Sequence, residues 1–125
     1  AERQRQQRDA RIQSARRLPR LPATHPCARV HGHSFVIELE LAGPIDPALG
    51  WLIDYNDIAA AFEPLRQKLD HRFLNEVEGL ENPTSEHIAR WVFDHLSPTL
   101  PALTAVTVME TPETRAIYRP RRGTA

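Results

Sequence analysis

The chain has 125 residues, 41% hydrophobic and 26% charged, and its 16 basic side chains balance 16 acidic ones. This length and composition predict one globular domain, and the zero net charge excludes a molecule-wide field that would attract nucleic acid or a membrane. The single cysteine, Cys27, excludes an internal disulfide, and no apolar run reaches the roughly 20 residues that span a bilayer. No signal-peptide segment is visible at the start, so we expect a cytoplasmic protein.

The first twenty residues differ from the rest of the chain, because they carry seven arginines with glutamines between them. We expect residues 1–15 to form an Arg-rich, flexible N-terminal segment, although weak alternation around Ile12 leaves a poorly specified strand open. A nucleic-acid-binding arm is a further hypothesis for this segment. It is disfavoured because no aromatic side chains interleave with the arginines.

The next elements are predicted from the spacing of their apolar residues. Period-two alternation predicts a strand over residues 34–42, and a short apolar run predicts another over residues 51–53. Helical spacing predicts a helix after Asp54 or Asn56, either of which can cap it. A second helix is predicted after Pro83, and two more strands over residues 105–111 and 116–119.

The order of these elements predicts an α+β domain over residues 16–120, with residues 121–125 as a C-terminal tail. Its antiparallel sheet would be covered by helices on one face. Such a sheet leaves strand edges and one face open, so self-association is expected.

One stretch, residues 27–35, places a thiol and two imidazoles close together. If a strand begins near His31, the side chains of His31 and His33 share one face. Two such imidazoles can occupy two corners of a zinc tetrahedron, and a nearby cation would favour the thiolate of Cys27. Alternatively, both histidines are half-buried strand residues that satisfy themselves by hydrogen bonding, and Cys27 is an inert small side chain.

Three further residues carry groups suited to acid–base chemistry or ligand binding. Asp70 precedes His71 at a helix end, where a carboxylate can orient an imidazole for proton transfer; the alternative is a surface pair. Glu110 is in phase with Val106 and Val108 on a strand. An inward carboxylate there is costly unless it meets a donor, such as a ligand edge with two N–H groups, or else it turns to solvent.

With these residues in place, the chain resembles the 6-pyruvoyl-tetrahydropterin synthase superfamily, and most closely its bacterial branch, the 6-carboxytetrahydropterin synthases of queuosine biosynthesis. The resemblance covers roughly residues 17–119 through a series of short motifs in compatible order. They are Arg17-Leu18-Pro19, Cys27, His31-Gly32-His33-Ser34-Phe35, Gly50-Trp51-Leu52-Ile53-Asp54, Leu69-Asp70-His71, Leu74-Asn75, Gly79-Leu80-Glu81-Asn82-Pro83-Thr84-Ser85-Glu86 and Glu110-Thr111.

The resemblance implies the tunnelling fold, in which a four-stranded antiparallel sheet of two hairpins carries two helices on one face. Three subunits would join their sheets into a barrel, and two trimers would stack as a hexamer with active sites between subunits. The implied reaction is that of a lyase, which converts 7,8-dihydroneopterin triphosphate to 6-carboxy-5,6,7,8-tetrahydropterin with release of acetaldehyde and triphosphate.

The resemblance also implies a role for each matching site residue. His31 and His33 would be zinc ligands, and the zinc ion would polarise the side-chain oxygens of the substrate. Cys27 would be the general base, Asp70 and His71 would complete a proton relay, and Glu110 would hold the pterin ring by its amino and N3 edge.

One position departs from the family pattern. The family's third zinc histidine corresponds to Arg16, and a guanidinium has no lone pair for a metal. Three accounts follow: His25 supplies the third ligand, the Arg16 guanidinium replaces the metal as a fixed cation, or the chain is a paralogue with a lost or altered zinc site. The paralogue would act on a related pterin or as a non-catalytic pterin-binding oligomer. Intact Cys27, Asp70 and His71 favour an enzyme.

Overall fold

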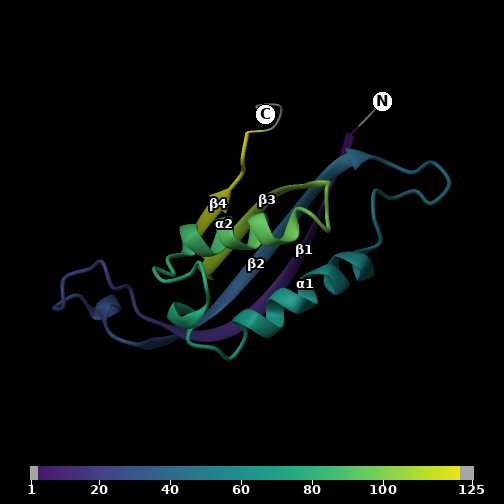
Figure 1. Cartoon of the computed structure of the whole chain (residues 1–125). Helices are drawn as coiled ribbons and strands as arrows, with labels where there is room; N and C mark the ends of the chain where they lie inside the picture. Colours follow the sequence, from purple (N-terminus) through teal and green to yellow (C-terminus); the bar gives the residue numbers. More distant parts are fainter. Residues whose placement is uncertain (1–2, 122–125) are drawn as a thin grey trace.

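The computed structural model of the protein describes residues 3–121. A four-stranded antiparallel sheet in the order β1-β2-β3-β4 carries two α-helices on one face (Figure 1). The elements are β1 (Arg3–Arg16), η1 (Pro26–Ala28), β2 (His31–Pro44), α1 (Tyr55–Leu69), η2 (Leu74–Glu76), α2 (Ser85–Leu96), β3 (Leu103–Thr111) and β4 (Thr114–Tyr118). The predicted sheet with two helices on one face is therefore confirmed.

The N-terminal segment differs from the flexible segment that the sequence predicts. Residues 3–16 form β1, which pairs with β2 along its whole length, from Arg3 opposite Pro44 to Arg16 opposite His31. Its alternate side chains are buried, although most of them are small or polar, which explains why the apolar pattern was weak. Residues 1–2 lie outside the described residues, as does the predicted tail beyond Arg121.

The short strand predicted over residues 51–53 is wrong, because these residues form bends that lead into α1. The side chain of Gln6 on β1 supplies the hydrogen bonds that a neighbouring strand would otherwise give this segment. Its carboxamide oxygen accepts from the backbone N–H groups of Leu52 and Ile53, and its NH₂ group donates to the carbonyl of Ile53. A buried side chain therefore satisfies backbone groups that the prediction had assigned to a sheet.

Both helices follow the predicted spacing. Asp54 caps α1 through the backbone N–H of Asn56, and Thr84 caps α2 through that of His87. The buried stripe of α1 packs with that of α2 and with the inner residues of the strands to form one core. Among the described residues, no helix has the length and apolar character that crossing a membrane requires.

Candidate active site

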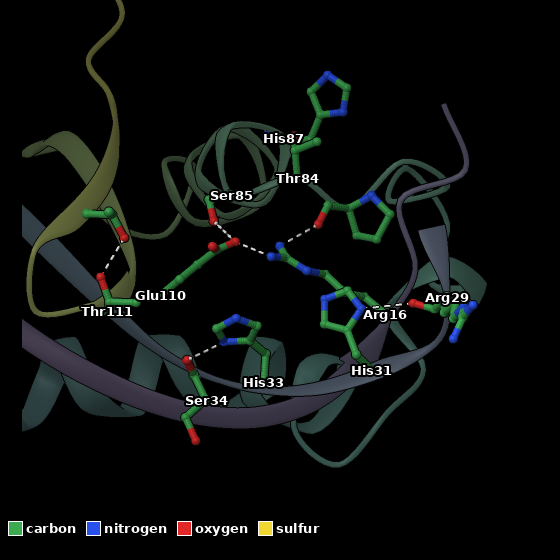
Figure 2. Close-up of polar contacts among 12 residues, drawn as sticks. Arg16, Arg29, His31, His33, Ser34, Thr84, Ser85, His87, Glu110 and Thr111 are labelled. Carbon is green, nitrogen blue, oxygen red and sulfur yellow. Dashed lines mark hydrogen bonds and ion pairs between the residues drawn. The ribbon is translucent and has the colours of Figure 1, made fainter. Parts of the chain in front are cut away.

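Three strand ends bring the candidate site residues to one end of the sheet. Arg16 at the end of β1 lies opposite His31 at the start of β2, and directly opposed residues of an antiparallel pair point to the same face. His33 follows on that face two residues later. Glu110 lies near the end of β3, where a bulge interrupts the pairing with β4. Figure 2 shows these four side chains converging beside the start of α2.

The guanidinium of Arg16 is buried, with only 3% of the side chain exposed. It donates to the carbonyl oxygen of Pro83 at 2.9 Å and forms a hydrogen-bonded ion pair with the carboxylate of Glu110 (Figure 2). Its carbon Cζ lies 5.0 Å from the centre of the Phe35 ring, within cation–π range. Its Nε–H group has no hydrogen-bond partner in the described part of the chain. Arg16 thus connects β1, β3 and the segment that begins α2.

Glu110 is held as a carboxylate at this junction. Its Oε1 accepts from Arg16 and from the hydroxyl of Ser85, the latter at 2.7 Å. Burial raises the pKa of Glu110, but the hydrogen bonds from Ser85 and Arg16, the charge of Arg16 and the electrostatic influence of the nearby His33 ring outweigh it, so the pKa lies below its ordinary value. The side chain remains 28% exposed, beside a cavity of about 150 Å³. An ionised oxygen acceptor is therefore available to a ligand.

The two strand histidines each use one ring nitrogen internally. Nδ1 of His31 contacts the carbonyl of Arg29 at 2.8 Å, and Nδ1 of His33 contacts that of Ser34 at 3.2 Å (Figure 2). A carbonyl partner favours the proton on Nδ1 and leaves Nε2 as an acceptor. The ring centres lie 5.9 Å apart, and both residues are half-buried.

The residues present do not fit a zinc site. Among the described residues, no group of three or more His, Cys, Asp or Glu side chains could hold a metal ion. His25 does not join His31 and His33, because its Nδ1 caps the turn η1 by accepting from the N–H of Cys27 at 3.0 Å. Protein zinc sites have at least three protein ligands, and Arg16 adds a positive charge directly opposite His31.

Asp70 and His71 lie together, as the sequence predicts, at the end of α1. Oδ2 of Asp70 is 3.7 Å from Nε2 of His71, and its Oδ1 accepts from the backbone N–H of Gln13 at 2.8 Å. His71 has a positive φ of 55°, which an N–H bond to the Gln13 carbonyl holds in place. Its ring is 75% exposed and, with His33, lines a groove of about 540 Å³.

Cys27 lies in the loop between β1 and β2, which extends beyond the helices (Figure 1). Its carbonyl accepts from the N–H of Leu18, and the residue is half-buried and carries a free thiol. No hydrogen bond among the described residues joins Cys27 to Asp70 or His71. One chain therefore brings Arg16, His31, His33 and Glu110 together, and places His71 across a groove from His33, without connecting Cys27 to them.

Sequence reasoning missed the partners of Glu110. Ser85 stood only as one residue of a family motif, whereas its hydroxyl donates to Glu110. Sequence reasoning also treated Arg16 and Glu110 separately. The available signal was a pair of opposite charges at inward positions of two strands, because each buried charge requires a partner.

Comparison with known proteins identifies the class to which this fold and site belong. Residues 6–121 match the family described as 6-pyruvoyl tetrahydropterin synthase. The chain belongs to this family.

Individual members of this family show which proteins the chain is similar to. The 6-carboxy-5,6,7,8-tetrahydropterin synthase of Synechocystis is 39% identical over 98 residues, covering 74% of this chain and 76% of that protein. The enzyme of the same description from Bacillus subtilis is 29% identical over 128 residues, covering 93% of this chain and 85% of that protein. A solved structure of Caenorhabditis elegans 6-pyruvoyl tetrahydropterin synthase has a TM-score of 0.87 and 26% identity, and the match covers 96% of this chain and 97% of that one. The chain is thus a homologue of lyases, as the sequence predicts.

Proposed function

We propose that this protein is a pterin-forming lyase, converting 7,8-dihydroneopterin triphosphate to 6-carboxy-5,6,7,8-tetrahydropterin with release of acetaldehyde and triphosphate, as a step of queuosine biosynthesis. The observation that carries the proposal is the ionised, partly exposed carboxylate of Glu110 beside two imidazoles. The names of the Synechocystis and Bacillus relatives support the choice of product.

Glu110 would bind the pterin ring. Its Oε1 is already an acceptor for Arg16 and Ser85, and the residue lines a small cavity. The amino and N3 groups of a pterin form an edge of adjacent N–H donors, which an ionised carboxylate binds strongly. Because the hydrogen bonds from Ser85 and Arg16 lower the pKa of Glu110, the carboxylate would be ready to bind at neutral pH without losing a proton.

The acid–base steps would fall to Cys27, Asp70 and His71. The carboxylate of Asp70 would orient the ring of His71, which lies 3.7 Å away and whose high exposure would let it exchange protons with a substrate or with solvent. Cys27, in its thiolate form, would accept a proton from the substrate side chain. Because these groups are not joined within one chain, we propose that a second subunit completes the site, in agreement with the expected oligomer.

The proposed activity is tested by incubating the purified protein with 7,8-dihydroneopterin triphosphate. Product formation is followed by chromatography of the pterins, and acetaldehyde by the oxidation of NADH in the presence of added alcohol dehydrogenase. We expect Glu110→Gln to reduce kcat/KM roughly 10- to 150-fold, because the neutral amide loses a charge-assisted contact of roughly 1.5–3 kcal/mol and presents an N–H group to the ligand's donors. The matched control is Glu113→Gln in the exposed β3–β4 turn, which should leave the rate unchanged.

The rival function is a pterin-binding oligomer without turnover. It is favoured by the same Arg16 that removes the third zinc ligand. In that case the protein would bind a pterin, with loss of binding in Glu110→Gln, while neither acetaldehyde nor a new pterin forms. A wild-type protein that neither binds nor converts pterins would contradict both functions.

A further inference from the structure

We propose that this site is metal-free, and that Arg16 supplies from within the chain the fixed positive charge of the site while excluding zinc from His31 and His33. The proposal deepens the proposed function, because it concerns the same site. It is tested by metal binding rather than by turnover, so the two can fail separately.

The site has too few side chains that can ligate zinc. His31 and His33 have free Nε2 atoms because their Nδ1 atoms contact backbone carbonyls. Two imidazoles fall short of the three protein ligands of the most open zinc sites. The described residues offer no third His, Cys, Asp or Glu in reach of both, and His25 is occupied as the cap of η1.

The guanidinium of Arg16 is held in a fixed position beside the two imidazoles. Strand pairing places it opposite His31, on the same face as His33. The Pro83 carbonyl, the Glu110 carboxylate and the Phe35 ring together hold the guanidinium in place. Moving it away to admit a metal would break an ion pair and expose Glu110 without a cation. The site therefore keeps its guanidinium charge, which repels a divalent cation at close range.

The carboxylate of Glu110 is not free to act as a metal ligand either. Glu110 lies in this cluster, and its Oε1 accepts from both Arg16 and Ser85 (Figure 2). Its Oε1 is therefore already engaged and is not open to a metal ion. The same ion pair that fixes Arg16 thus also engages Glu110, the acidic side chain beside the two imidazoles.

The charge acts through Glu110 rather than on the substrate. With 3% of its side chain exposed, Arg16 has almost no surface for a ligand, whereas Glu110 is 28% exposed. Arg16 therefore keeps the carboxylate ionised and aimed, and it fixes the segment at Pro83 from which α2 begins. The groups left to contact a substrate's oxygen atoms are the imidazoles of His31 and His33.

The test measures zinc affinity of the full-length protein against a chromophoric chelator, with bound zinc counted by elemental analysis after dialysis. Wild-type protein should retain no stoichiometric zinc. Arg16→His should retain about one zinc per chain, with affinity at least about 100-fold higher, because it removes the charge and supplies a third imidazole. Arg16→Lys keeps a cation at the same position and should bind no more zinc than wild type. Arg11→His, at an exposed position of the same strand, is the control for an added histidine.

Stoichiometric zinc in the wild-type protein overturns the proposal. So does an Arg16→His variant that folds, as judged by its circular dichroism, and binds zinc no better than wild type. If that variant does not fold, nuclear magnetic resonance of the imidazole nitrogens in wild-type protein decides. Zinc addition should leave the Nε2 signals of His31 and His33 unshifted, and a shift at one equivalent refutes metal exclusion.

Discussion

Arg16 carries a full charge into a buried position that three partners make tolerable. The carboxylate of Glu110 neutralises it, the carbonyl of Pro83 accepts one of its N–H groups, and Phe35 covers its face. Removing one partner of a buried pair costs roughly 3–5 kcal/mol, and the partial exposure of Glu110 places this pair toward or below the lower value. At this scale the site is organised by an ion pair.

The pH dependence of ligand binding follows from the lowered pKa of Glu110. The carboxylate must be ionised to accept from a pterin, so binding is complete above its pKa and is lost as the pH falls through that value. The wild-type protein should therefore still bind the pterin at pH values below the ordinary pKa of a glutamate, which is about 4.3. Ser85→Ala removes a donor to the ionised form and should move the loss of binding to higher pH.

The measurement is a titration of pterin fluorescence at a series of pH values. The charged groups facing Glu110 are Arg16 on β1, His33 on β2, Glu86 on α2 and Arg115 on β4. All of them stay in place in Ser85→Ala. Ser97→Ala, at the other end of α2, is the control. Identical midpoints for wild type and Ser85→Ala would show that the hydroxyl does not govern this titration.

Among the elements, β1 shows how tertiary contacts can replace a strong local pattern. Its inward residues include Gln6, Ser14 and Arg16, which are poor signals of a strand. Each finds a partner outside the sheet: Gln6 contacts the segment before α1, Ser14 donates to the carbonyl of Leu69, and Arg16 donates to the carbonyl of Pro83. The strand is thus fixed by polar contacts to the helical layer as well as by pairing with β2.

We expect Gln6→Ala to lower the free energy of unfolding by about 2 kcal/mol. The variant leaves the N–H groups of Leu52 and Ile53 without their acceptor, and each hydrogen bond contributes about 0.5–1.5 kcal/mol. Urea unfolding followed by circular dichroism measures the change. Gln4→Ala, at an exposed position of the same strand, should change stability by less than about 0.5 kcal/mol. Equal effects of the two substitutions would contradict this role for Gln6.

On the scale of the whole molecule, the sheet ends in two outer strands, and residues 70–73 bond to only one end of the β1 edge, at Gln13 and Ala15. β1 and β4 are the outer strands, and β4 carries Ile117 with 57% of its surface exposed. Unpaired edges and exposed apolar side chains favour association. The separation of Cys27 from Asp70 and His71 in one chain favours it too, because a second subunit is then needed to complete the proposed acid–base set.

We expect the protein in solution to have three or six times the mass of one chain, as measured by light scattering after size exclusion. Ile117→Asp should shift the population toward smaller species by placing a charge at the outer strand. Arg115→Asp exchanges one charge for another two residues earlier and serves as the comparison. A monomeric wild type at micromolar concentration would contradict the oligomer and leave the acid–base set incomplete.

The sequence by itself determined the helices, the strands β2, β3 and β4, and the residue types of the site. Apolar side chains recur at clear helical or alternating spacing there, and local spacing decides which face is buried. It also determined that Arg16 cannot be a metal ligand, since that is a property of the guanidinium alone.

Only the tertiary structure decided what Arg16 and Glu110 do. They are separated by the whole domain in sequence, and no local pattern states that one neutralises the other. The same holds for β1, whose inward polar residues find partners in segments some fifty residues away. The role of a buried polar group depends on the groups with which it pairs, and the packing of the sheet against its helices decides which groups those are.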